Sequence, residues 1–335
     1  MKNDPQTVSA TEDSQKNDES LRMLHHIRRT LAYHEGLLDD AVRNRTFYKA
    51  LKRHVRKNSS VMDIGSGTGL WAIAAARLGA LRVVAIEQDE MLRPIIRKLA
   101  ARNGVSDRIE IVTGDSRQVK VSGKFDVIIT ETVGNEAFDE GIVPIIIDAR
   151  KRFLKKTGVV IPQAIAAVAA PAHLTKADES FPAGLKLDYR YLELLNLDIP
   201  KNINDSTRVE LLGKPATLTH VDLQTVRELP ALSQMTCSWK LKDASLLNCL
   251  VLWAEVLLTK GVSLRTFPDT RSWTPICLPL QPLEEGPAVI DCSVTMSNRH
   301  YYWTVTHHKN GKQQVQSHSP MFPYTAIQTQ RLQNQ

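Results

Sequence analysis

Three glycines stand at alternate positions in residues 63–69, which read DIGSGTG. The apolar run VMDI leads into them, and the helical pattern LWAIAAAR follows. A glycine-rich turn between a strand and a helix is typical of a doubly wound parallel sheet that binds a nucleotide-like ligand at the carboxyl ends of its strands. The spacing G-x-G-x-G departs from the G-x-G-x-x-G of dinucleotide sites, which disfavours a nicotinamide-dependent oxidoreductase.

Strand and helix patterns alternate from residue 61 to about residue 167, which predicts an α/β domain with a doubly wound sheet. Glu87 ends the second strand pattern, 18 residues beyond Gly69. A carboxylate at that place can accept hydrogen bonds from both hydroxyls of a ribose.

The second half of the chain changes character. Short β-rich runs such as QMTCSWKLK and LVLWAEVLLT are separated by Pro, Gly and Asn, which predicts a mainly antiparallel barrel or sandwich. Residues 188–230 are less regular and are predicted to project from it as an arm-like insertion. We therefore expect a tail at 1–20, a ligand-binding domain with N-terminal helices at 21–162 and a β domain at 163–335.

Composition limits the partners. The first 20 residues are polar and predict a disordered tail, and no apolar run approaches the ~20 residues that span a membrane. The net charge is +7, and the basic run KALKRHVRK lacks interleaved aromatic residues, so we expect neither nucleic acid nor membrane as partner. The four cysteines are far apart without a CxxC pair, which predicts reduced thiols, no metal site and a cytoplasmic location.

Two glutamates flank a short loop after the fourth strand pattern, in ETVGNEAFDE. If the loop folds back, Glu131 and Glu140 face one pocket and repel each other unless a cation lies between them. A guanidinium suits that place, because it offers bidentate hydrogen bonds and stays charged. An acidic surface loop with exposed carboxylates remains the alternative from the spacing alone.

Several motifs together resemble a known family. The glycine turn with its acidic partner is similar to motif I of the class I S-adenosylmethionine-dependent methyltransferases. The nine-residue spacing of Glu131 and Glu140 resembles the double-E loop of the protein arginine methyltransferases. Upstream, HEGLLDDAVRNRTF resembles that family's helix H-E-x-x-L-x-D-x-x-R, and GVVIP at 158–162 resembles its crossover into a β-barrel domain.

The resemblance implies roles for individual residues. It implies S-adenosylmethionine as cofactor, Glu131 and Glu140 as catalytic residues, and His34 and Trp273 in the substrate pocket. It places the insertion at 188–230 as a dimerisation arm, which implies a homodimer or a hetero-oligomer with a homologue. The residues that it implies for cofactor binding are Arg43, Asp63, Gly65, Gly67, Gly69, Glu87, Asp115 and Ser116.

Two departures from the family leave the substrate open. The first helix lacks the aromatic Y-F-x-x-Y motif, and Arg271 and Ser272 precede Trp273 where the family carries Thr-His. Arginine in a protein or peptide is the first expectation. Free L-arginine or another small guanidino metabolite is the alternative, and a catalytically inactive regulatory subunit is the second alternative.

Overall fold

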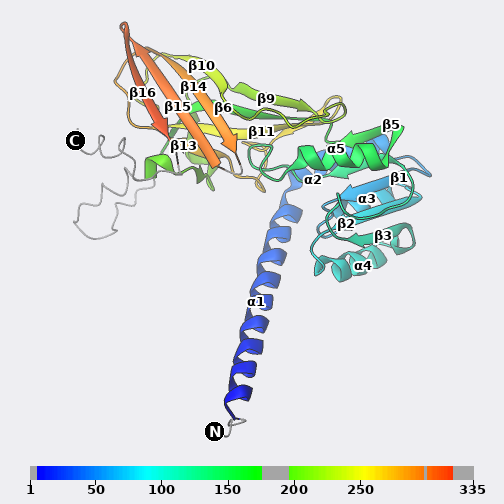
Figure 1. Ribbon diagram of the computed structural model, residues 1–335. Coiled ribbons are helices and arrows are strands. Elements are labelled where there is room, and N and C mark those ends of the chain that lie inside the picture. Colours follow the sequence, from blue (N-terminus) through cyan, green and yellow to red (C-terminus); the bar gives the residue numbers. More distant parts are fainter. Residues whose placement is uncertain (1–5, 176–195, 298–299, 320–335) are drawn as a thin grey trace.

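The computed structural model describes residues 6–175, 196–297 and 300–319 (Figure 1). An α/β domain and a β domain lie side by side, and a long N-terminal helix extends away from both. The described part of the chain confirms the expected order of a doubly wound sheet followed by a mainly antiparallel β domain.

The first domain contains a five-stranded parallel sheet in the order β3-β2-β1-β4-β5. The direction of the order reverses between β1 and β4, and ligands of doubly wound sheets bind at such a point, beyond the carboxyl ends of the strands. The strands are β1 (Ser60–Ile64), β2 (Arg82–Glu87), β3 (Ile109–Thr113), β4 (Phe125–Thr130) and β5 (Leu154–Ile161). The helices that connect them are α3 (Leu70–Arg77), α4 (Leu92–Arg102) and α5 (Ile142–Phe153).

The second domain contains two antiparallel sheets. One has the order β10-β14-β15-β16, and the other is built around the long strands β6 and β11. The members of the first are β10 (Met235–Leu241), β14 (Ala288–Ser297), β15 (His300–Lys309) and β16 (Lys312–His318). The members of the second are β6 (Ala164–Leu174), β7 (Lys201–Asn202), β8 (Val209–Leu211), β9 (Ala216–Asp222), β11 (Cys249–Thr259), β12 (Val262–Arg265) and β13 (Ile276–Pro279).

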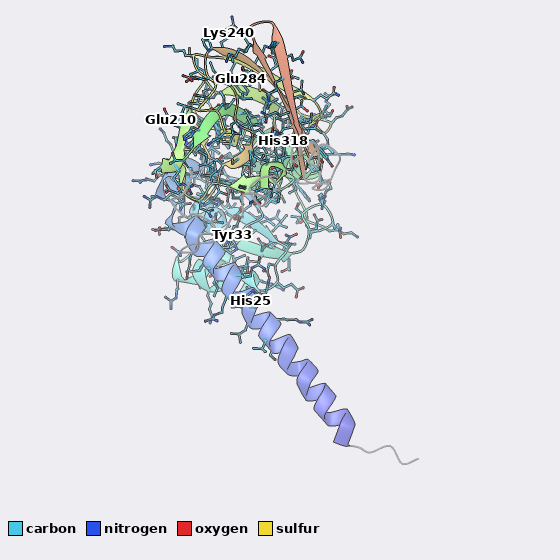
Figure 2. All side chains as sticks on the ribbon, turned by 90° about the vertical axis from the view of Figure 1, so that its left-hand side faces the viewer. His25, Tyr33, Glu210, Lys240, Glu284 and His318 are labelled. Carbon is cyan, nitrogen blue, oxygen red and sulfur yellow. The ribbon has the colours of Figure 1, made fainter. Side chains whose placement is uncertain are left out.

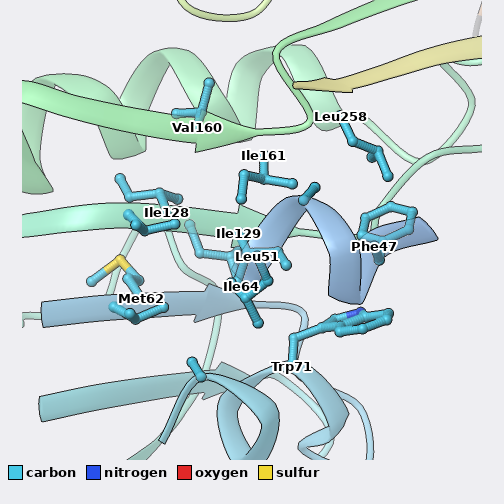
Figure 3. Packing of buried hydrophobic residues seen from close by; sticks show 14 of the residues in the cluster. Phe47, Leu51, Met62, Ile64, Trp71, Ile128, Ile129, Val160, Ile161 and Leu258 are labelled. Carbon is cyan, nitrogen blue, oxygen red and sulfur yellow. The ribbon is translucent and has the colours of Figure 1, made fainter. Parts of the chain in front are cut away.

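One hydrophobic core joins the two domains. Phe47 on α2 (Ala41–His54) stacks on Trp71 of α3, with ring centroids 5.2 Å apart. Figure 3 shows this pair beside Leu51, with Leu258 of the β domain close to the same helix. The helix α2 therefore packs against both domains and fixes their relative position.

The predicted disordered tail is wrong for residues 6–20. The helix α1 (Gln6–Asp39) begins at Gln6, and neither glycine nor proline interrupts the chain from Gln6 to Glu35. Once part of a helix is held by packing, each further residue adds a hydrogen bond, so the helix extends along this uninterrupted stretch. None of the described helices is long and apolar enough to cross a membrane.

The projecting insertion at 188–230 is wrong for residues 201–222. The strands β8 and β9 pair with β6, and β7 pairs with β13. The backbone groups along the edge of β6 that does not face β11 need hydrogen-bond partners, and β8 and β9 provide them. Residues 188–195 of the predicted arm lie outside the described part of the chain.

Candidate active site

A cavity of about 890 Å³ lies at the carboxyl ends of β1, β2, β3 and β4, with α1 across it. Most of the residues predicted for the site line this cavity: His34, Arg43, Gly65, Gly67, Glu87, Asp115, Ser116, Glu131 and Glu140. The sheet topology brings them together, because they follow different strands that end at the same edge. Asp63, Gly69 and Trp273 do not line the cavity.

The glycine turn forms the floor of the cavity. Gly67 has a φ of +56°, and a Cβ there would lie 2.6 Å from Cε1 of His34 on α1. Any side chain at this position would collide with the helix that covers the cavity, and it would also strain the backbone. The close approach explains why the turn requires glycine and how His34 comes to lie over it.

Asp63 supports this turn from below. It is fully buried, and its Oδ2 accepts a hydrogen bond of 2.9 Å from the backbone N–H of Ala72 in the first turns of α3. Burial raises its pKa to about 7, although the Ala72 and Ser66 hydrogen bonds act in the opposite direction. The predicted contact of Asp63 with a cofactor stays a prediction, and the structure adds a contact with the helix that follows the turn.

Glu87 lies at the end of β2 with its carboxylate held by two backbone groups. Its Oε2 accepts from Gly67 N–H at 2.8 Å, and its Oε1 accepts from Asp89 N–H at 2.9 Å. Asp89 in turn is 3.1 Å from Nε2 of His26 on α1. The same carboxylate thus links the turn after β1 to the loop after β2 at the cavity wall.

The loop after β3 brings a charged pair to the cavity. Arg117 donates two hydrogen bonds to the carboxylate of Asp115, at 3.0 and 2.6 Å. These bonds hold the pKa of Asp115 below its usual range. Ser116 is buried beside them, and its carbonyl accepts a hydrogen bond from Arg152.

Arg43 forms a buried ion pair with Glu131. Its guanidinium lies 5.7 to 6.0 Å from the ring centroids of Phe47, Trp71 and Trp273, and it is 3% exposed. Burial raises the pKa of Glu131, and the adjacent guanidinium acts in the opposite direction. The predicted contact of Arg43 with a cofactor carboxylate stays a prediction. In the structure, the carboxylate partner of Arg43 is Glu131.

Tyr33 is a site residue that the motif comparison missed. It lines the cavity one residue before His34, and the two rings meet edge to face with centroids 5.3 Å apart. Burial and the charges of Glu140 and Glu131 raise the pKa of its hydroxyl. In the sequence, Tyr33 is an isolated aromatic residue directly before His34 and Glu35, and it is not part of a Y-F-x-x-Y motif.

The loop between Glu131 and Glu140 is held by the β domain. Trp273 Nε1 donates to the carbonyl of Val133 at 2.7 Å, and the backbone N–H of Thr274 donates to Oδ1 of Asn135 at 2.9 Å. The hydroxyl of Thr266 donates to the carbonyl of Asn135 at 3.2 Å. Trp273, predicted in the substrate pocket, therefore positions the loop from behind.

Asp40 ties the helices to the same part of the β domain. It caps α2 by accepting from Arg43 N–H at 3.0 Å, and its Oδ2 accepts from the backbone N–H groups of Arg271 and Ser272 at 2.9 and 3.0 Å. Burial alone would raise its pKa, but the Ser272 hydroxyl and these backbone groups hold it below the usual range. The altered Arg271–Ser272 segment thus anchors the helix that carries Arg43.

Comparisons with known proteins agree with this geometry. Residues 46–166 match the family model of ribosomal protein L11 methyltransferase (PrmA). An arginine N(omega)-methyltransferase from Streptomyces achromogenes subsp. streptozoticus is 27% identical over 271 residues, which are 76% of this chain and 73% of that protein. A probable protein arginine N-methyltransferase 6.1 from Oryza sativa subsp. indica is 28% identical over 239 residues, 68% of this chain and 62% of that protein.

A solved structure extends the comparison to the fold. The PRMT1 enzyme–prozyme heterotetrameric complex with AdoHcy from Trypanosoma brucei contains a chain that superposes with a TM-score of 0.71 at 19% identity. The match covers 85% of the present chain and 96% of that one. At 19% identity, the match concerns the fold alone, that is, the arrangement of the two domains.

Proposed function

We propose that the chain is a divergent member of the protein arginine methyltransferase family and that it methylates an arginine side chain of a protein or peptide. The methyl donor is S-adenosylmethionine. The observation that carries the proposal is that Glu131 and Glu140 line the same cavity as the glycine turn and Glu87. One cavity can therefore hold a methyl donor and a guanidinium side by side.

The cavity residues fit S-adenosylmethionine. The carboxylate of Glu87 lies at the end of β2, where it would hold the ribose hydroxyls, and Gly65 and Gly67 line the same cavity beside the rest of the molecule. Asp115 and Ser116 would lie against the adenine. The bound molecule supplies a methyl group on a positively charged sulfur, which is already a strong electrophile.

The two glutamates would bind the substrate guanidinium and orient one of its nitrogens toward the methyl group. Positioning is the main demand on the protein, because the electrophile needs no further activation. The carboxylates also draw positive charge toward the nitrogens that they contact, which leaves electron density on the attacking one. Arg43 favours the ionised form of Glu131, and the high pKa of Tyr33 keeps its hydroxyl protonated near both carboxylates.

Transfer of labelled methyl from S-adenosylmethionine tests the proposal. An Arg/Gly-rich peptide and free L-arginine are assayed side by side, and we expect label on the peptide. The Glu140→Gln variant should lose it, while Glu210→Gln on the exposed strand β8 should not. Label on free arginine alone would overturn the protein substrate, and label on neither, with S-adenosylhomocysteine still bound, would indicate an inactive subunit.

We also propose partners and a location for the protein. We propose a homodimer, or a hetero-oligomer with a homologue, in which part of the predicted arm at 188–230 provides the contact. A cytoplasmic location remains our proposal from the reduced cysteines. Equilibrium sedimentation of the purified chain, alone and with deletion of residues 188–195, tests the role of the arm.

A further inference from the structure

Exposed leucines follow one side of α1. Leu24, Leu31 and Leu38 recur at intervals of seven residues, and their exposed fractions are 56%, 39% and 45%. Leu21, one turn before Leu24, is 63% exposed. A seven-residue repeat of leucines brings the side chains to the same side of a helix, as in the seam of a coiled coil.

Leu21, Leu24 and Leu31 of this leucine face do not line the cavity, whereas Leu38 does. The residues of α1 that line the cavity include Thr30, Tyr33 and Leu37. At roughly 100° per residue, Tyr33 lies about 180° around the helix from Leu24. Figure 2 shows that α1 meets the body of the molecule near Tyr33 and stands clear of it beyond His25. The side of α1 that carries Tyr33 therefore serves the cavity, and Leu21, Leu24 and Leu31 lie on the other side, each at least 39% exposed.

A helix of this kind needs a partner. Burying one leucine side chain contributes roughly 1.5–3 kcal/mol, and helices without tertiary packing are marginal in water. We propose that a second copy of this chain covers the leucine face of α1, so that the two α1 helices form an antiparallel pair.

The charges on the leucine face favour a second copy in this orientation. Arg28 and Glu35 lie between the leucines on the same side of the helix. In an antiparallel pair centred near Leu31, Arg28 of one copy lies beside Glu35 of the other, and Leu24 lies beside Leu38. A parallel pair in register would instead place Arg28 against Arg28 and Glu35 against Glu35, which is unfavourable.

The size of the leucine face sets the strength of the contact. Residues 21–38 extend over about 27 Å of helix at 1.5 Å per residue. A single helix pair of that length buries less than the ~1,200 Å² of stable complexes, so the association is weak and depends on concentration. It is independent of the contact proposed for the arm at 188–230.

Charge reversal tests the pair. In sedimentation velocity over a concentration series, we expect Arg28→Glu and Glu35→Arg each to weaken self-association about tenfold, because each contact occurs twice by symmetry. The double variant Arg28→Glu/Glu35→Arg should restore it. Leu31→Glu should abolish the contact, and Leu81→Glu, at a position that is 65% exposed on the first domain, should leave it unchanged. Circular dichroism establishes that each variant is folded.

Three outcomes would overturn the proposal. They are a wild type with no association step beyond the arm-mediated dimer at any concentration, such a step that Leu31→Glu leaves intact, and a double variant as weak as the single ones. Oxidative cross-linking gives an independent result. Leu31→Cys, near the two-fold axis, should cross-link to itself, whereas Arg28→Cys should cross-link only when mixed with Glu35→Cys. The native cysteines are buried or half-buried, so the wild type serves as the blank.

Discussion

The hydroxyl of Ser272 donates a hydrogen bond of 2.6 Å to Oδ2 of Asp40, although 232 positions separate the two residues. The same carboxylate oxygen accepts two backbone N–H groups, and the other oxygen caps α2. One buried side chain therefore links the helix that carries Arg43 to the segment that carries Trp273.

Removing the Ser272 hydroxyl should weaken this link. We expect Ser272→Ala to lower the free energy of unfolding by about 1–2 kcal/mol, because a hydrogen bond to a charged, buried acceptor is lost. Chemical denaturation measures the change, with Ser263→Ala on the exposed side of β12 as the matched control. Equal stability of the two variants would show that the backbone groups alone hold Asp40.

The two glutamates of the loop should respond differently to the same substitution. Glu140→Gln should reduce kcat by roughly 10²–10³ with little effect on folding. Glu131→Gln should cause a similar loss and also cost about 3–5 kcal/mol of stability, because it leaves Arg43 buried without its ion-pair partner. Methyl transfer and thermal unfolding are measured on both variants.

The double variant Glu131→Gln/Arg43→Met separates the two effects. It should recover part of the stability and none of the activity. If Glu131→Gln unfolds at the same temperature as Glu140→Gln, the ion pair with Arg43 contributes nothing to the fold.

Alanine at position 67 should impair binding of the methyl donor. Gly67→Ala combines a positive φ with a Cβ that would lie 2.6 Å from His34, so the turn or the helix must shift. We expect the Kd for S-adenosylhomocysteine to rise at least about tenfold, since αL backbone and displaced contacts together cost more than ~1.4 kcal/mol. Isothermal titration calorimetry checks this, and Gly36→Ala, with open space around it, is the control.

A carboxylate within the loop should make stability depend on pH. Glu136 is 2% exposed, and burial together with the neighbouring Asp139 raises its pKa to about 8. The folded chain therefore holds a proton between the ordinary pKa of 4.5 and about pH 8 that the unfolded chain has released. Stability from this group is complete below pH 4.5 and declines as the pH rises toward 8.

The variant Glu136→Gln cannot ionise and should remove that decline. The difference between its unfolding temperature and that of the wild type should therefore grow in favour of the variant from pH 5 to pH 8. Tyr301 and Asp139 are the neighbouring groups that interact with Glu136, so Tyr301→Phe is measured beside it. Parallel pH profiles for the wild type and Glu136→Gln would contradict this assignment.

The sequence predicted the structure correctly where the pattern along the chain directly reflects burial or the ends of strands. The strands around Val61 and Val83 are buried on both faces, and their continuous apolar runs predicted the parallel sheet. The glycine turn, Glu87 and the two loop glutamates were also found, because their spacing along the chain reflects the ends of neighbouring strands. Strands β8 and β9 were missed, since Glu210 and His220 leave only a weak alternation of apolar and polar residues along them.

Other features depend on contacts that no local pattern contains. Asp40 is an ordinary helix cap in the sequence, and its link to Ser272 exists only after the two domains meet. Tyr33 was hidden because its role comes from its distance to Glu131 and Glu140 in space. The length of α1 was underestimated, since polar composition predicts solvation but does not exclude a helix.

The hydrogen bond from Trp273 to Val133 has a consequence for the order of events during synthesis. A ribosome releases residues 131–140 long before Trp273, Thr274 and Thr266 have been made, so the loop first emerges without the partners of Val133 and Asn135. The first domain contains its own sheet and can collapse at that stage. The loop between Glu131 and Glu140 then takes its final shape only when the β domain has folded against it.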